Sequence, residues 1–192
     1  MAATNDIPII VDYNYLSNIT PAIGNLGGSN PKWTVTYNNK QYVLKNSNGC
    51  NPTADIDICK YIAATEVLTY RLFKLANILV PNLILVKQTS PSDNDKVINW
   101  YVMSEFMDDF NNFSRDSDEK KSILGKNNKF DLQQKIHKTF YICIWLSYRD
   151  IKFDNIGYTK ENNLVFIDVG GSLNYKSQGK KKPQDEFSNI PK

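Results

Sequence analysis

An amide and a carboxylate flank a short apolar segment in the second half of the chain. Asn155 comes directly before this segment, and Asp168 follows it, at the start of the string Asp-Val-Gly-Gly. The runs Ile156 to Tyr158 and Leu164 to Ile167, joined by Lys160 to Asn163, predict a β-hairpin. Because the two ends of a hairpin lie side by side, we expect Asn155 and Asp168 to lie close together. Amide and carboxylate oxygens suit Mg²⁺, which binds few protein groups and leaves room for phosphate oxygens.

A second carboxylate precedes this pair on the same predicted loop. Asp150 lies five residues before Asn155, just after the apolar stretch Phe130 to Ser147, which predicts a helix that is buried nearly all round. A carboxylate that faces the same site can accept a proton from an attacking hydroxyl group. Ordinary structural roles are the alternative: Asp150 as a residue after a helix, and the string at Asp168 as a tight turn.

The strings around these residues resemble two motifs of protein kinases. Tyr-Arg-Asp-Ile-Lys-Phe-Asp-Asn, which ends at Asn155, is similar to the catalytic loop H-R-D-L-x-x-x-N with tyrosine in place of histidine. The Asp-Val-Gly string at Asp168 is similar to D-F-G with Val169 in place of phenylalanine. The resemblance implies that Asp150 is the catalytic base and that Lys152 neutralises the transferred phosphoryl group. It makes Asn155 and Asp168 the metal ligands.

The first half of the chain carries counterparts of the other kinase elements. Lys45 ends the string Tyr-Val-Leu-Lys and resembles the strand lysine that holds the α- and β-phosphates, with Glu66 in the following helix as its ion-pair partner. The resemblance also implies a degenerate phosphate-covering loop and an adenine-binding hinge; their residues are Gly24, Gly27, Gly28, Ser29, Glu105 and Met107. Each signal is weak alone, because a strand-end lysine is usually solvated and a glycine-rich segment is usually a turn.

The elements that must position these residues mix strand and helix patterns. The expected order is strand, strand, helix, strand, strand, insertion, helix and hairpin, over 32–37, 41–44, 55–76, 83–88, 97–106, 107–128, 130–147 and 156–167. In the first helix the apolar residues at helical spacing are Ile58, Ile62, Leu68, Leu72 and Leu75. We expect an α+β, two-lobed protein-kinase-like fold, with an N-lobe over about 1–106 and a much reduced C-lobe over about 107–192.

The C-lobe is the point at which the chain departs from standard kinases. Only 24 residues follow Asp168, which leaves no room for the A-P-E motif and the helices beyond it. The chain therefore resembles a divergent branch of compact kinases found in bacterial effectors, toxins and viruses. The resemblance implies a cytoplasmic protein, in the host cytoplasm if it is an effector. Either the helix over 130–147 and the insertion over 107–129 build the substrate lobe, or a second copy or partner chain completes the small C-lobe.

Bulk composition excludes several other classes. The formal net charge of +3, from 23 basic and 20 acidic residues, is too even for a nucleic-acid-binding protein. Three cysteines without CxxC spacing argue against a disulfide framework or a zinc site and favour a reducing compartment. No stretch approaches the roughly 20 apolar residues that a membrane span needs. His137, the single histidine, fits a structural or surface role.

These features favour an ATP- and Mg²⁺-dependent enzyme, with Mn²⁺ as an alternative ion. The leading hypothesis is a Ser/Thr protein kinase, because Lys152 follows the base as it does in that class. The alternatives are a small-molecule kinase, an enzyme of the same fold that transfers AMP, and a nucleotide-binding pseudokinase. Tyr148 and Val169 keep the last alternative open, since both replace residues that normally pack the loop into its active shape.

Overall fold

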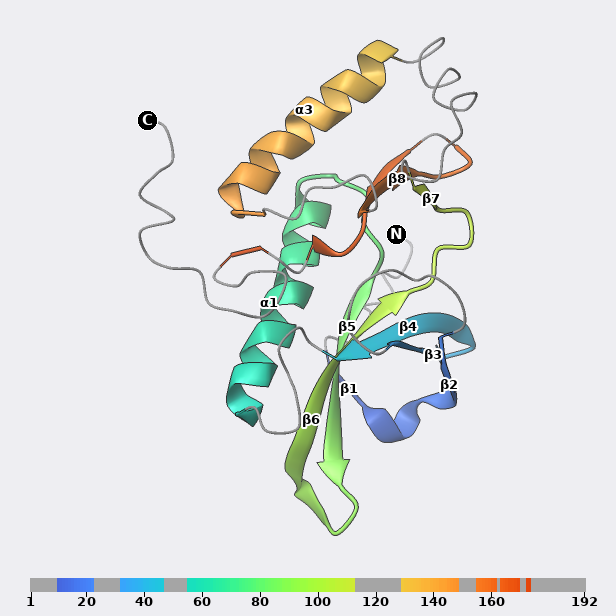
Figure 1. The fold of residues 1–192 in the computed structure, drawn as a ribbon, viewed down its shortest axis with the longest axis vertical. Helices are drawn as coiled ribbons and strands as arrows, with labels where there is room; N and C mark the ends of the chain where they lie inside the picture. Colours follow the sequence, from blue (N-terminus) through green and yellow to red (C-terminus); the bar gives the residue numbers. More distant parts are fainter. Residues whose placement is uncertain are drawn as a thin grey trace, which may run out of the picture. The chain divides into compact units, whose positions relative to one another are not determined.

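The computed structural model places the chain in two compact units (Figure 1). It describes residues 10–22, 32–46, 55–112, 129–148, 155–161, 163–169 and 172–173. The first unit comprises Met1–Val67 and Pro81–Met107, and the second comprises Leu68–Val80 and Asp108–Lys192. This division differs from the expected lobes chiefly in the segment 68–80, which belongs to the second unit.

The first unit is built on a six-stranded sheet with the order β1-β5-β6-β4-β3-β2. The strands are β1 (Ile10–Asp12), β2 (Ser17–Pro21), β3 (Lys32–Tyr37), β4 (Lys40–Asn46), β5 (Leu83–Ser90) and β6 (Asp93–Glu105), with the 3-10 helix η1 (Tyr13–Tyr15) between the first two. Neighbours are antiparallel except β1 and β5, which are parallel. The edge strands β1 and β2 were not predicted, and every residue of β2 is exposed, so it carries no alternating apolar signal.

The β3–β4 hairpin shows how the sequence sets the sheet. Asn38 and Asn39 both have positive φ values, 47° and 61°, as a tight hairpin turn requires. Alternation along β4 then buries Tyr42 and Leu44 in the core on one face and turns Lys45 to the other face. The buried residues of that core are Val11, Leu16, Val35, Tyr42, Leu44, Ile84, Val86, Tyr101 and Met103.

Helix α1 (Ile56–Leu75) carries residues of both units. The Asp55 carboxylate accepts a hydrogen bond from the Asp57 N–H at 2.9 Å, and Asn77 adopts a positive φ of 58° just past the last turn. The predicted bounds are therefore confirmed to within one residue. The buried face differs from the apolar pattern, because Ile58, Leu68 and Leu75 are exposed; the buried residues are Cys59, Ile62, Ala63, Glu66, Val67, Thr69, Tyr70 and Phe73.

The second unit contains a three-stranded sheet with the order β7-β8-β9. The strands are β7 (Asn111–Asn112), β8 (Ile156–Tyr158) and β9 (Leu164–Phe166), all antiparallel to their neighbours. The predicted hairpin is confirmed as β8 and β9, whereas β7 lies in the region expected to be irregular. A side chain at Gly157 would overlap the Asn111 carbonyl oxygen and the Phe110 ring, so this close strand pairing requires glycine.

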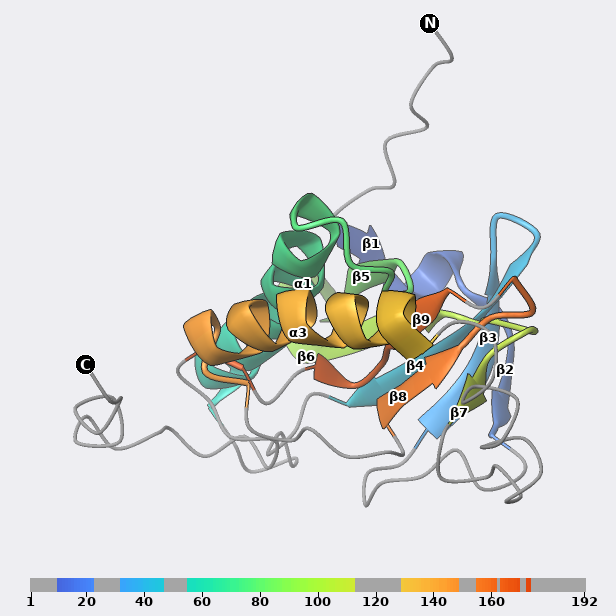
Figure 2. The ribbon, with the colours of Figure 1, turned by 90° about the horizontal axis from the view of Figure 1, so that it is seen from above.

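Helix α3 (Lys129–Trp145) contacts β9 (Figure 2). The prediction of a helix buried nearly all round is wrong. Among the side chains of this helix that the structure describes, Thr139 and Cys143 are buried, as is Leu146 just beyond the helix, whereas the exposed apolar residues are Phe140, Tyr141, Ile144 and Trp145. Burial raises the pKa of the Cys143 thiol to about 12.

Two further expectations concerned reduced cysteines and the lack of a membrane span. Cys59 is disulfide-bonded, contrary to the expectation of reduced thiols, and its partner is not among the described residues, since Cys143 is a free cysteine. No helix within the described part of the chain is long and apolar enough to cross a membrane.

Candidate functional site

A buried ion pair joins β4 to α1 in the first unit. The Lys45 Nζ lies 2.6 Å from the Glu66 Oε1, and their side chains are 12% and 2% exposed. The pairing predicted from the sequence is therefore present. A carboxylate this deeply buried is stable only with a partner, so Glu66 restricts the Lys45 ammonium group to one position.

Both elements that carry this ion pair, β4 and α1, contact β6. Lys45 stands opposite Val102 in the register between β4 and β6, which places it in the interior of the sheet. The first half of α1 contacts β6 through Lys60, whose Nζ lies 5.6 Å from the centre of the Trp100 ring. An ammonium group at this distance from an indole ring is attracted to its face.

In the second unit, the β8–β9 hairpin brings Asn155 and Asp168 together, as its spacing predicts. Ile156 stands opposite Phe166, and the Ile167 N–H donates to the Asn155 carbonyl oxygen at 2.8 Å. Asn155 therefore stands opposite Ile167, and Asp168 is the residue directly after Ile167.

Tyr148 orients the Asn155 amide. The Asn155 Nδ2 donates to the Tyr148 hydroxyl at 3.4 Å, and both residues are buried. The Tyr148 ring packs edge-on against Phe73, with centroids 6.3 Å apart. The tyrosine that replaces the motif histidine thus links the Asn155 side chain to Phe73 of α1. The sequence marked Tyr148 only as a departure from the motif.

Asp168 lies in a turn that is fixed on both sides. Its φ is 53°, in the left-handed region, and its N–H donates to the Tyr70 hydroxyl at 2.6 Å. Val169 is fully buried, and the Ser172 Oγ donates to its carbonyl oxygen at 2.7 Å. The turn is tied to the end of α3, because the Leu173 N–H donates to the Leu146 carbonyl oxygen at 2.6 Å.

The chemistry of the donor set fits a hard divalent cation. Asn155 offers an amide oxygen and Asp168 a carboxylate, and both kinds of oxygen suit Mg²⁺ or Mn²⁺. Within the described ranges, no cluster of three or more His, Cys, Asp or Glu side chains forms a metal site of another kind. A cation here would have few protein ligands, which leaves coordination positions for phosphate oxygens.

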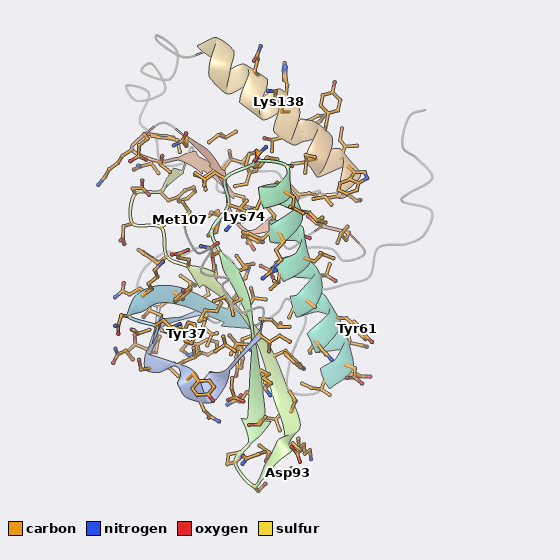
Figure 3. All side chains as sticks on the ribbon, turned by 180° about the vertical axis from the view of Figure 1, so that it is seen from behind. Tyr37, Tyr61, Lys74, Asp93, Met107 and Lys138 are labelled. Carbon is orange, nitrogen blue, oxygen red and sulfur yellow. The ribbon has the colours of Figure 1, made fainter. Side chains whose placement is uncertain are left out.

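Two N–H groups in the predicted hinge already donate hydrogen bonds to neighbouring backbone. The Glu105 N–H already donates to the Asn82 carbonyl oxygen at 2.9 Å, and the Phe106 N–H donates to the Gln41 carbonyl oxygen at 3.1 Å. The Glu105 carboxylate meets the Lys40 Nζ at 3.0 Å and also accepts from the Asn82 amide. The Glu105 N–H is thus not a base-binding group. Met107, just beyond β6 (Figure 3), stays a candidate.

Six predicted site residues lie outside the described residues: Asp150, Lys152, Gly24, Gly27, Gly28 and Ser29. Their flanks can still be placed. The Ala22 N–H donates to the Lys32 carbonyl oxygen at 3.0 Å, at the open end of the antiparallel β2–β3 pair. The strands β2 and β3 therefore pair on either side of this segment.

Comparison with known proteins identifies the fold. No protein-family model matches the chain, and no curated protein matches it. The solved structure of the Helicobacter pylori proinflammatory kinase CtkA is similar, with a TM-score of 0.53 at 16% sequence identity. The match covers 85% of this chain and 60% of that one, so the chain spans about 60% of the length of that protein. The predicted α+β, protein-kinase-like fold with a reduced C-terminal lobe is confirmed.

Proposed function

We propose that this chain is an ATP- and Mg²⁺-dependent phosphotransferase that phosphorylates serine or threonine hydroxyl groups of a protein substrate. The observation that carries the proposal is that the β8–β9 ladder sets Asn155 and Asp168 close together in the backbone, where the Tyr148 hydroxyl accepts from the Asn155 amide and the Tyr70 hydroxyl accepts from the Asp168 N–H. The Lys45–Glu66 ion pair supports it from the first unit.

The proposed chemistry assigns one task to each side chain. Lys45, held by Glu66, binds the α- and β-phosphates, and Asn155 and Asp168 hold Mg²⁺, which neutralises charge on the phosphates. Asp150 accepts the proton of the acceptor hydroxyl as its oxygen bonds to the γ-phosphorus. The bond from that phosphorus to the bridging oxygen breaks, and ADP leaves.

The two departures from the kinase motifs support turnover over a pseudokinase. Tyr148 contacts Asn155 and packs on Phe73, and Val169 is fully buried in the turn after Asp168. Both substituted residues thus have packing or hydrogen-bond contacts next to the proposed metal ligands. Ligands whose neighbours are fixed are preorganised, which is what catalysis by positioning requires.

The kind of acceptor and the cellular setting rest on likeness alone. The similar solved protein is described as a proinflammatory kinase. We propose a protein acceptor because Lys152 follows Asp150 as in Ser/Thr protein kinases, and a cytoplasmic setting, of a host cell if the chain is an effector, from the resemblance to compact kinases. A second copy or partner chain that completes the small second unit is part of the proposal. The exposed apolar residues of α3 offer surface for it.

The test is incubation with γ-labelled ATP and, separately, α-labelled ATP, with Mg²⁺ and a cell lysate. Label transferred to protein from γ only, on serine or threonine after hydrolysis, supports the proposal. Label from α would mean AMP transfer, and label confined to small molecules would mean a small-molecule kinase. No transfer from either nucleotide would favour the pseudokinase. Asp168→Ala serves as the inactive control.

A further inference from the structure

The backbone at Asp168 is held in a conformation that a side-chain-bearing residue rarely adopts. Its φ of 53° lies in the left-handed region, where aspartate is tolerated but is less stable than in extended or helical backbone. Such a conformation persists when surrounding contacts over-determine it. The contact made by the Asp168 N–H is therefore of interest, because it acts directly on this peptide.

Tyr70 of α1 supplies that contact. Its hydroxyl accepts the Asp168 N–H at 2.6 Å, and Tyr70 is 3% exposed. The donor and acceptor are 98 residues apart in sequence, and both belong to the second unit. Helical spacing puts Tyr70 one turn after Glu66.

We infer that Tyr70 is a positioning residue for the metal ligand Asp168, an inference that rests on the proposed function. The residue before Asp168, Ile167, is held by the bond from its N–H to the Asn155 carbonyl oxygen, and the residue after it, Val169, is fully buried. The Tyr70 hydroxyl fixes the N–H between them, so the Cα from which the carboxylate projects has one position. Without the hydroxyl, the part-buried N–H loses its acceptor and the left-handed conformation loses a constraint.

The test is Tyr70→Phe, which removes one oxygen and keeps the ring that packs in the core. Binding of ATP is measured by calorimetry in excess Mg²⁺ and again in EDTA, and the ratio of the two dissociation constants gives the gain due to metal. We expect this gain to fall roughly two- to tenfold, the size of one hydrogen bond. Binding in EDTA should stay unchanged.

The matched control is Tyr61→Phe, at a residue of the same helix that is 63% exposed (Figure 3). It should leave both constants at their wild-type values. Hydrogen exchange at the Asp168 amide of the wild-type protein gives a second readout, and we expect this amide to be protected.

The outcomes separate the inference from the function beneath it. If wild-type protein gains affinity from Mg²⁺ and Tyr70→Phe gains as much, the inference is wrong and the proposed function stands. Equal weakening with and without Mg²⁺ would reduce Tyr70 to a structural role and also overturn the inference, as would an unprotected Asp168 amide. Wild-type protein that binds ATP no better in Mg²⁺ than in EDTA would contradict both.

Discussion

In the first unit, the buried side chains of Lys45 and Glu66 compensate each other's charge. Removing one charge of a buried pair leaves the other without compensation, whereas removing both can be nearly neutral. Lys45→Met should therefore lower the free energy of unfolding by about 3 kcal/mol. The double variant Lys45→Met with Glu66→Leu should recover most of that loss, as measured by denaturant unfolding.

Nucleotide binding should follow a different pattern from stability. Both Lys45→Met and the double variant should bind ATP more weakly than the wild type, because both lack the Lys45 ammonium group that is proposed to bind the phosphates. The Lys40–Glu105 pair is the matched control, since the Lys40 side chain is 62% exposed and Lys40→Met should leave the stability close to that of the wild type. A Lys45→Met variant that retains wild-type affinity for ATP would contradict the role proposed for this lysine.

At the same scale, the sequence predicted which charged and amide side chains lie close together. It did not predict which tyrosine hydroxyl groups form hydrogen bonds with these residues. The Lys45–Glu66 pair and the approach of Asn155 to Asp168 follow from motif spacing. The Tyr70 and Tyr148 hydroxyl contacts do not, because tyrosine in an apolar stretch looks like any other core residue. Only the packed structure reveals which hydroxyl meets which backbone or amide group.

At the scale of secondary-structure elements, the local sequence predicted the end of a helix or strand wherever a turn or a capping residue sets that end. Asn38 and Asn39 predicted the β3–β4 turn, and Asn77 predicted the end of α1, because asparagine adopts positive φ at low cost. Burial was predicted less well. It depends on neighbours that the pattern of one segment does not contain, so the apolar α3 turned out largely exposed and α1 buries Glu66 on its inner face.

Gly157 provides a test at this scale. Its position in β8 faces the Asn111 backbone so closely that a methyl group would overlap a carbonyl oxygen, and a paired backbone cannot move aside. Gly157→Ala should cost roughly 1–3 kcal/mol, typical of overpacking, and lower the melting temperature by several degrees. The comparison is Ser92→Ala in the exposed β5–β6 turn, which should melt within about a degree of the wild type. A Gly157→Ala protein as stable as that control would mean that β7 does not pair as described.

For the whole molecule, the proposed function requires residues of both units to act on one ligand. Lys45 belongs to the first unit and Asp168 to the second. Mg²⁺–ATP at about 100 times its dissociation constant should stabilise the folded protein by about 2.7 kcal/mol. For a chain of this length, that corresponds to a rise in melting temperature of roughly 5–10 °C.

Single and double variants then show whether one ligand or two are involved. If one ATP needs both residues, Lys45→Met and Asp168→Ala should each remove most of the thermal shift. The thermal shift of the double variant should then be reduced no more than in the more affected single variant, because either substitution alone already prevents ATP from binding. Two independent sites would instead give partial losses that add. Additive losses in the thermal shift would show that the buried lysine and the hairpin carboxylate serve different ligands, and the kinase-type reaction would have no common substrate on which to act.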